Sequence, residues 1–190
     1  MTFETFDSKG LHLPPEQRHS LELAFRNARS FAQEPQGWLV FLGPSGCGKT
    51  HLAASIGNYQ KQQGRPVRFE VVPDLLDHFR STFSPDSRVA YDELFEGVRT
   101  TPLLILDDLE TGTSTPWAVE KLYQILNHRY NARLPTVITS RASLDDIEDR
   151  LSSRMGDPRL STVIALPPVD LRIDRKPAEK KPPRSWRRGG

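Results

Sequence analysis

Short apolar runs alternate along the chain with segments in which apolar residues recur at helical spacing. The runs are rich in β-branched residues and predict five buried strands, at Trp38–Leu42, Val67–Val72, Leu103–Leu106, Thr136–Thr139 and Thr162–Leu166. Helices are predicted to begin at Pro14-Pro15 and at about Pro73, and to cover Thr50–Gln63, Tyr91–Val98 and Trp117–Tyr130. This alternation predicts an α/β fold in which helices cover both faces of a parallel five-stranded sheet. In such folds the ligand site lies at the carboxyl ends of the strands.

A glycine-rich segment joins the first predicted strand to the next helix. Its residues are Gly43, Pro44, Ser45, Gly46, Cys47, Gly48, Lys49 and Thr50, and they match the phosphate-loop pattern G-x-x-x-x-G-K-[ST]. The backbone N–H groups of such a loop bind the phosphates of ATP, as does the amino end of the following helix, where His51 lies. Lys49 is expected to contact the β- and γ-phosphate oxygens, and the Thr50 hydroxyl is expected to ligate Mg²⁺. The alternative is a glycine-rich turn without a ligand.

The third predicted strand ends in two carboxylates, Asp107 and Asp108, as does the acidic strand that accompanies phosphate loops. Asp107 is expected to hold the Mg²⁺, directly or through water, and Asp108 to polarise the water that attacks the γ-phosphate. Many ATPases have glutamate at the second position, and aspartate is shorter by one methylene, about 1.5 Å of reach. We therefore expect slow hydrolysis, or help from Glu110. The alternative for the acidic pair is a turn or a helix cap.

The phosphate loop, Leu104-Ile-Leu-Asp-Asp108 and Pro135-Thr-Val-Ile-Thr-Ser140 together resemble the ATPase core of the DnaC/DnaI-type helicase loaders. This AAA+ family includes the IstB-type transposition helpers. The resemblance covers most of the chain and implies a P-loop NTPase fold of AAA+ type, with no helical lid after Leu166. The loaders also carry a helicase-binding domain before this core, but only about forty residues precede the phosphate loop here. A fragment, a truncated paralogue and a protein that binds its partner through another surface are all open interpretations.

Several roles follow only from this resemblance. Phe3 and Phe6 are expected near the adenine, the alternative being that they fill the core. In the family, a polar residue at the end of the fourth strand helps to orient the attacking water, and asparagine commonly follows Thr-Ser. Arg141 stands at that position here, so the role is assigned to Ser140 or Thr139 and inefficient hydrolysis is expected.

The resemblance also implies contacts with partners. Asp149-Arg-Leu-Ser-Ser-Arg154 resembles the box that presents an arginine finger to the nucleotide of the next subunit. Arg154 is the predicted finger, with Arg150 second, and hydrolysis would then require self-association. The alternative is a surface helix with salt-bridged arginines.

A replicative DNA helicase and single-stranded DNA are the other implied partners. The DNA is expected at the segment Arg80-Ser-Thr-Phe83, where an arginine can bind phosphate and a ring can stack on a base. Phe79 and Phe83 have the i, i+4 spacing of a core pair, so Arg80 is the better candidate for the DNA contact.

Charge changes this picture mainly at the carboxyl end. The chain of 190 residues has a net charge of +2, but residues 171–190 hold eight basic and two acidic side chains, which leaves residues 1–170 at −4. Prolines and a closing Gly-Gly deny this stretch a helix. We therefore expect a single AAA+ core at residues 1–170 and a disordered basic tail at 171–190, which is either a solvated end or a contact with nucleic acid.

The remaining composition excludes several classes of protein. Cys47 is the single cysteine, so an internal disulfide and a cysteine-based zinc module are ruled out. Cys47 is expected to pack inside the loop, the alternative being an oxidisable thiol whose pKa is lowered by Lys49. The apolar runs are too short to span a membrane and the N-terminus lacks the pattern of a secretory signal, which predicts a cytoplasmic protein without membrane contact.

Three function classes remain. The first is a slow, partner-stimulated ATPase that uses ATP to control binding of a helicase and single-stranded DNA, with the IstB-type transposition helper as a related form. The second is a small-molecule P-loop kinase, which would need an acceptor pocket and a mobile lid. The third is a non-hydrolysing nucleotide-binding adaptor, suggested by Asp108, Arg141 and the missing domain. The sequence favours the first.

Overall fold

The computed structural model describes residues 1–8, 10, 13–82, 88–110 and 115–171. These residues contain one parallel sheet with the strand order β2-β3-β4-β1-β5. The strands are β1 (Trp38–Leu42), β2 (Val67–Val71), β3 (Leu103–Asp107), β4 (Thr136–Ser140) and β5 (Ser161–Ala165). The predicted five-stranded parallel sheet is therefore confirmed, with strand ends that differ by at most one residue from the expected ranges.

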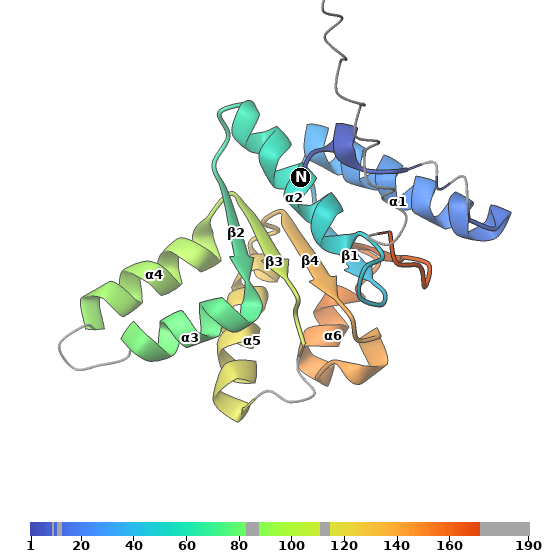
Figure 1. The fold of residues 1–190 in the computed structure, drawn as a ribbon. Coiled ribbons are helices and arrows are strands. Elements are labelled where there is room, and N and C mark those ends of the chain that lie inside the picture. The colour runs from blue at the N-terminus through green and yellow to red at the C-terminus, as the bar shows by residue number, and fades with distance from the viewer. Residues whose placement is uncertain (9, 11–12, 83–87, 111–114, 172–190) are drawn as a thin grey trace, which may run out of the picture.

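The helices lie on both faces of the sheet, as Figure 1 shows. They are α1 (Pro15–Gln33), α2 (Lys49–Gln62), α3 (Val72–Thr82), α4 (Arg88–Thr100), α5 (Pro116–Asn131) and α6 (Asp149–Met155), with short 3-10 turns at η1 (Phe3–Thr5) and η3 (Leu144–Asp146). One face is covered by α1 and α2, and the other by α3 to α6. In the described ranges no helix combines the length and apolar character that crossing a membrane requires.

Each buried strand contributes side chains to both faces. On β1, Trp38 and Val40 belong to the apolar cluster under α3 to α6, while Leu39 and Phe41 belong to the cluster under α1 and α2. All four are at most 2% exposed. Burial on both faces explains why the inner strands β1 and β3 are continuous apolar runs. The edge strands β2 and β5 are only partly buried, which corrects the prediction that all five strands are buried.

A buried arginine fixes β4 beside its neighbours. Arg129 of α5 is fully buried and donates hydrogen bonds to the Thr136 hydroxyl and to the carbonyl oxygens of Arg99, Thr101 and Pro135. Burial lowers the pKa of this guanidinium to about 10. Its donors join the ends of α4 and α5 to the start of β4, so the strand that carries Thr139 is held from its first residue.

The helix α6 was expected only as the alternative to an arginine-finger box, a surface helix with salt-bridged arginines. It is seven residues long, which is too short for helical spacing to stand out among its charged residues. The Glu148 side chain accepts hydrogen bonds from the backbone N–H groups of Arg150 and Leu151, and Leu151 and Met155 are fully buried. The predicted tail at 171–190 lies outside the described residues except for Leu171.

Candidate nucleotide-binding site

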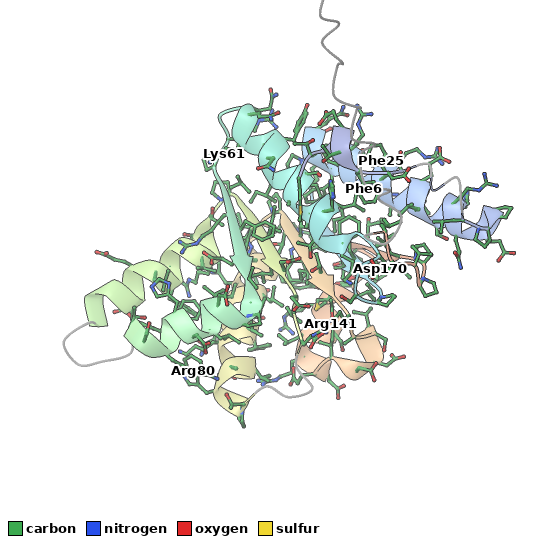
Figure 2. All side chains as sticks on the ribbon, in the orientation of Figure 1. Phe6, Phe25, Lys61, Arg80, Arg141 and Asp170 are labelled. Atoms are coloured by element: carbon green, nitrogen blue, oxygen red, sulfur yellow. The ribbon has the colours of Figure 1, made fainter. Side chains whose placement is uncertain are left out.

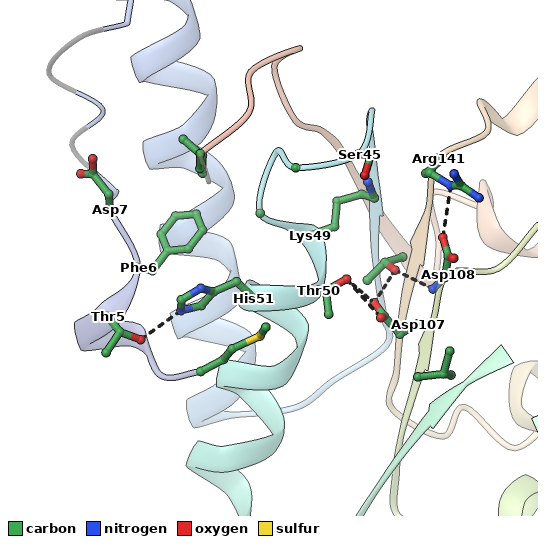
Figure 3. A pocket seen from close by; sticks show the side chains of 16 residues that line it. Thr5, Phe6, Asp7, Ser45, Lys49, Thr50, His51, Asp107, Asp108 and Arg141 are labelled. Carbon is green, nitrogen blue, oxygen red and sulfur yellow. Dashed lines mark hydrogen bonds and ion pairs between the residues drawn. The ribbon is translucent and has the colours of Figure 1, made fainter. Parts of the chain in front are cut away.

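A cavity of about 740 Å³ opens at the carboxyl ends of the strands, beside the amino end of α2. Six of its lining residues come from the phosphate loop and the first turn of α2: Ser45, Gly46, Gly48, Lys49, Thr50 and His51. The sheet side contributes Val71, Asp107, Asp108, Thr139 and Arg141. Figure 3 shows Thr50 facing Asp107, Lys49 extending toward Ser45 of the loop, and Arg141 beside Asp108. The phosphate loop and the acidic strand therefore meet as the sequence predicted.

The phosphate loop depends on glycine where its backbone is left-handed. Gly46 has φ +85° and Gly48 has φ +100°, and a Cβ on Gly48 would lie 2.7 Å from the Phe6 ring. Because α2 begins directly after Gly48, the first N–H groups of the helix open into the cavity. Such an end favours anions, since its N–H groups lack helical partners and the helix dipole is positive there.

The Lys49 ammonium lies folded against the loop. It donates to the carbonyl oxygens of Gly43 at 2.6 Å and Pro44 at 2.8 Å, and its side chain is almost fully buried. Both acceptors are neutral, so the ammonium retains its attraction for an anion. Gly43, Pro44 and Cys47 do not line the cavity. Burial raises the pKa of the Cys47 thiol and outweighs the nearby Lys49 charge, which agrees with the expected packing role and argues against an activated thiol.

Three oxygen-bearing side chains converge at the end of β3. The Thr50 hydroxyl donates to the Asp107 carboxylate oxygens at 2.9 and 3.1 Å, and the Thr139 hydroxyl donates to Asp107 Oδ1 at 2.7 Å. Thr139 also accepts from the Asp108 backbone N–H at 2.9 Å. Hydroxyl and carboxylate oxygens are ligands that Mg²⁺ prefers, so Thr50 and Asp107 fit the predicted metal position beside the phosphates.

Asp108 is held in an uncommon backbone conformation, with φ 59°. Its carboxylate lies 3.4 Å from Arg141 Nε, and the same guanidinium pairs with Glu110 at 2.5 and 2.9 Å. The Glu110 hydrogen bond, followed by the charge of Asp108, raises the pKa of Arg141. The sequence offered no sign of this pairing, because it depends on β3 and β4 being neighbours.

The structure distinguishes between the two residues considered for the polar role on β4. Thr139 lines the cavity and contacts both aspartates, whereas Ser140 does not line it. The Ser140 hydroxyl accepts from the Ala142 backbone N–H at 3.1 Å, and its side chain is fully buried. A role for Ser140 in orienting the attacking water stays a prediction, and its side chain does not line the cavity.

The N-terminal segment forms one wall of the cavity. Phe6 stacks on Phe25 at a ring distance of 5.7 Å and meets the His51 ring at 5.2 Å. His51 Nε2 lies 2.9 Å from the Thr2 carbonyl oxygen, which fastens η1 to α2. Phe6 lines the cavity, whereas Phe3 packs against the Phe25 edge. The other residues of this wall were not among the predicted site residues: Met1, Thr5, Asp7 and, from the segment after β5, Leu171.

The two arginines of α6 lie outside this cavity. Arg154 donates to Asn127 Oδ1 at 2.6 and 3.1 Å and to the Tyr123 hydroxyl at 3.1 Å, and its guanidinium lies over the Tyr123 ring. Arg150 pairs with Glu148 at 2.7 Å and with Glu120 at 3.2 Å. Within one chain Arg150 thus has the ion pairs of a salt-bridged surface helix, whereas Arg154 is held by neutral partners, and a role of either arginine toward a second chain stays a prediction.

The segment predicted to contact DNA divides into buried and exposed parts. Phe79 is fully buried, with ring distances of 5.8 Å to Tyr91 and 5.6 Å to Phe95, so it is a core residue. Phe83 lies outside the described residues. Arg80 is exposed on the surface in Figure 2 and lies 5.3 Å from the Trp117 ring, an aromatic neighbour that the sequence did not suggest.

Comparison with known sequences identifies relatives of this chain. Residues 13–166 match the family described as IstB-like ATP binding protein. The replicative helicase loader DnaC of Buchnera aphidicola subsp. Schizaphis graminum is 28% identical over 141 residues, which are 74% of this chain and 57% of the relative. DnaC of Escherichia coli K12 is 26% identical over 137 residues, 70% of this chain and 56% of the relative. The chain thus spans little more than half the length of these relatives.

Solved structures share the fold. A crystal structure of the DnaC helicase loader has a TM-score of 0.68 at 22% identity, and the match covers 87% of this chain and 96% of the DnaC chain in that structure. A crystal structure of DnaI has a TM-score of 0.68 at 23% identity and covers 89% of each chain. The matched family covers most of the chain, so the protein belongs to the IstB-like ATP-binding family and has a DnaC-type AAA+ core.

Proposed function

We propose that this chain binds ATP with Mg²⁺, hydrolyses it slowly, and uses the bound nucleotide to control its contacts with a replicative DNA helicase and single-stranded DNA. The observation that carries the proposal is the convergence of Lys49, Thr50, Asp107 and Asp108 on one cavity at the amino end of α2. This is the set that phosphoryl transfer from ATP to water requires: a cation, a metal position and a water-polarising carboxylate.

Each residue has a separate task in the proposed reaction. Lys49 leaves the loop carbonyls for the β- and γ-phosphate oxygens, while the N–H groups at the start of α2 bind the phosphates. Thr50 and Asp107 hold the Mg²⁺, which when bound supplies positive charge to the phosphate oxygens. Asp108 orients the attacking water and accepts its proton, giving ADP and phosphate. Thr139 positions both aspartates, because its single hydroxyl contacts each of them.

The choice of partners rests on the named relatives and on the surface of the chain. The relatives are replicative helicase loaders, and a similar structure is the initiator DnaA bound to AMPPCP and single-stranded DNA. Arg80 beside Trp117 offers a cation and an aromatic ring, which suits a single strand. In this proposal the protein acts in the cytoplasm, and a transposase replaces the helicase as partner if the chain serves as an IstB-type helper.

A non-hydrolysing adaptor is the second candidate, favoured by the ion pair between Arg141 and Asp108. ATP binding and ATP hydrolysis by the purified chain separate the two. Both are measured across a protein concentration series, with and without single-stranded DNA, beside Lys49→Ala. The matched control is Lys61→Ala, which removes an exposed lysine at the other end of the same helix (Figure 2).

We expect turnover that rises more than proportionally with protein concentration, increases with DNA, and disappears in Lys49→Ala but not in Lys61→Ala. ATP binding without turnover would favour the adaptor. Failure of the unaltered chain to bind ATP would refute both candidates. Turnover that increases when small hydroxyl-bearing acceptors are added would favour the kinase class instead.

A further inference from the structure

A second cavity, of about 210 Å³, lies at the opposite end of the sheet from the nucleotide cavity. It opens where α5 and α6 end and where β4 and β5 begin, and its lining residues are Tyr130, Asn131, Arg133, Asp157, Arg159 and Leu160. Pockets that enclose a whole organic ligand measure roughly 300 to 1,000 Å³. This cavity therefore has room for a single polar group of a larger molecule that lies along the surface.

Arg159 is held in this cavity by an acid. The Asp157 carboxylate accepts hydrogen bonds from Arg159 Nε at 3.0 Å and Nη2 at 2.7 Å, and the Tyr130 hydroxyl donates to the same carboxylate. The hydrogen bond from Arg159, followed by that from Tyr130, lowers the pKa of Asp157, so the carboxylate stays ionised. The Arg159 side chain is 78% exposed, and its Nη1 group donates to none of the described residues. A guanidinium that is fixed along one edge and open along the other is oriented for a second anion.

Arg133 supplies a positive charge that no acid compensates. Among the described residues no hydrogen bond or ion pair holds its guanidinium, which is exposed at the same cavity. Its backbone is left-handed, with φ 52°, a conformation that is unfavourable for residues other than glycine. The fold imposes this turn, because the N–H groups of Arg133 and Leu134 donate to the carbonyl oxygens of Tyr130 and Arg129, and the buried Arg129 guanidinium donates to the Pro135 carbonyl oxygen. Residues held in such strain concentrate at functional sites.

The neighbouring loops continue the positive charge across this end of the sheet. Arg99 precedes β3 and Arg65 precedes β2, so the strand order β2-β3-β4-β1-β5 places both in a row beyond Arg133. Adjacent strands lie about 4.8 Å apart. Arg65 is exposed, whereas Arg99 is paired with Glu96. Residues 1–170 carry a net charge of −4, so a row of arginines is an exception in this part of the chain. Such a row suits the repeated phosphates of a nucleic acid better than a single small anion.

We propose that the cavity beside Arg133 and Arg159 binds a backbone phosphate of a nucleic acid. Arg133 contributes the net charge, Arg159 contributes oriented donors, and the nucleic acid continues past Arg99. Contacts of this kind position a nucleic acid without reading its sequence. The site is separate from the DNA contact proposed at Arg80, which lies 3.5 Å from the Thr115 hydroxyl at the start of α5. Arg133 follows the end of that helix, and its sixteen residues span about 24 Å.

The test is the affinity for two fluorescent oligonucleotides, one single-stranded and one duplex, measured by anisotropy over a series of salt concentrations. Arg133→Ala should lower the slope of log affinity against log salt by about 0.7 for the single strand or about 0.9 for the duplex. Relative to binding at about 1 M salt, the smaller change makes binding about eightfold weaker at about 0.05 M salt.

Three further variants accompany this measurement. Arg159→Ala should change the slope by a similar amount, because it removes the oriented donors. Arg133→Lys should keep most of the slope, since the positive charge remains. The matched control is Arg26→Ala, which removes a 61% exposed arginine on α1 and should leave the slope unchanged.

Arg133→Gly separates a role in binding from a role in the fold. Glycine adopts φ 52° without strain, so the melting temperature should not fall, whereas nucleic-acid binding should weaken as much as in Arg133→Ala. An arginine that only stabilises the end of α5 would show a lower melting temperature at unchanged binding, and that result would contradict the proposal. Arg133→Gly also carries the test if Arg159→Ala, which deprives Asp157 of its cation, fails to fold.

The remaining outcomes are equally decisive. Unchanged salt slopes for both oligonucleotides in Arg133→Ala and Arg159→Ala would overturn the inference. An equal loss in Arg26→Ala would do the same, because it would show an effect of net charge alone. Inorganic phosphate that binds only when Arg133 is present, with oligonucleotide binding unaltered, would reveal a site for the free anion instead.

The proposed function is judged separately from this site. Loss of DNA binding in Arg80→Ala, with no change in Arg133→Ala, would leave the proposed DNA contact in place and remove this one. ATP binding should be the same in Arg133→Ala as in the unaltered chain, because the two cavities lie at opposite ends of the strands. If the unaltered chain binds ATP but neither oligonucleotide, the inference and the DNA contact fail while the nucleotide site stands.

Discussion

Replacing Thr139 by valine removes one hydroxyl that serves two aspartates. Thr139 is 1% exposed, donates to Asp107 Oδ1 at 2.7 Å and accepts from the Asp108 N–H at 2.9 Å. A hydrogen bond to a charged group contributes about 1.5 to 3 kcal/mol, and the partly buried Asp108 amide, left without a partner, costs up to about 1 kcal/mol more. Valine keeps the shape, so the free energy of unfolding should fall by about 3 kcal/mol. For a domain of this size the melting temperature should fall by about 6 to 12 °C.

The matched variant is Thr139→Ser, which keeps the hydroxyl and loses one buried methyl, a cost of about 1 kcal/mol. Urea unfolding of both variants and the unaltered chain gives the comparison, and Mg²⁺ titration of ATP binding is the functional readout. Thr139→Val should need more Mg²⁺ than Thr139→Ser, because Asp107 loses a contact that orients it. Equal stability of the two variants, or greater stability of Thr139→Val, would refute the assignment of Thr139 as the link between the two acids.

Two further substitutions test the loop and the finger. Gly48→Ala should destabilise the chain and weaken ATP binding, since the residue has φ +100° and the new methyl would meet the Phe6 ring. The control is Gly64→Ala, because Gly64 has φ +69° but no atom within 4 Å of an added Cβ. In the same urea experiment it should lose only the cost of backbone strain, about 1 kcal/mol. Arg154→Ala should leave the ATP dissociation constant almost unchanged and remove DNA-stimulated hydrolysis; loss of ATP binding would contradict a role toward a neighbouring chain. Stability should also fall in this variant, because three of its hydrogen bonds to Asn127 and Tyr123 are lost.

The sequence predicted those features that depend on near neighbours in the chain. A strand buried on both faces is a continuous apolar run, which is why the limits of β1 were predicted to the residue. The phosphate loop is eight consecutive residues whose glycines and lysine act together, and its position between strand and helix needs no knowledge of the rest of the fold. The acidic end of β3 was predictable for the same reason.

Features that depend on which strands are neighbours could not be predicted. Arg141 and Glu110 are 31 positions apart, and only the order of the sheet places the ends of β3 and β4 together. The double contact of Thr139 has the same origin, so the sequence analysis could name Ser140 for this role although Thr139 is the residue that lines the cavity. The wall formed by Phe6 and His51 joins a terminal segment to α2, and no periodicity indicates such a contact.

The arginines of α6 show how a matching motif can leave the acting residue undecided. Arg154 makes four hydrogen bonds within its own chain and lies over the Tyr123 ring, so reaching another chain would break a well-packed set of contacts. Arg150 also lies over the Tyr123 ring, but its polar contacts are ion pairs to Glu120 and Glu148, whose side chains are 45% and 30% exposed, so water can replace them more easily. The position in the motif favours Arg154 as the arginine finger, whereas Arg150 could leave its present contacts more easily. A finger at Arg154 therefore requires that binding a second chain also rearranges Asn127 and Tyr123, so self-association and the packing of α6 on α5 would be coupled.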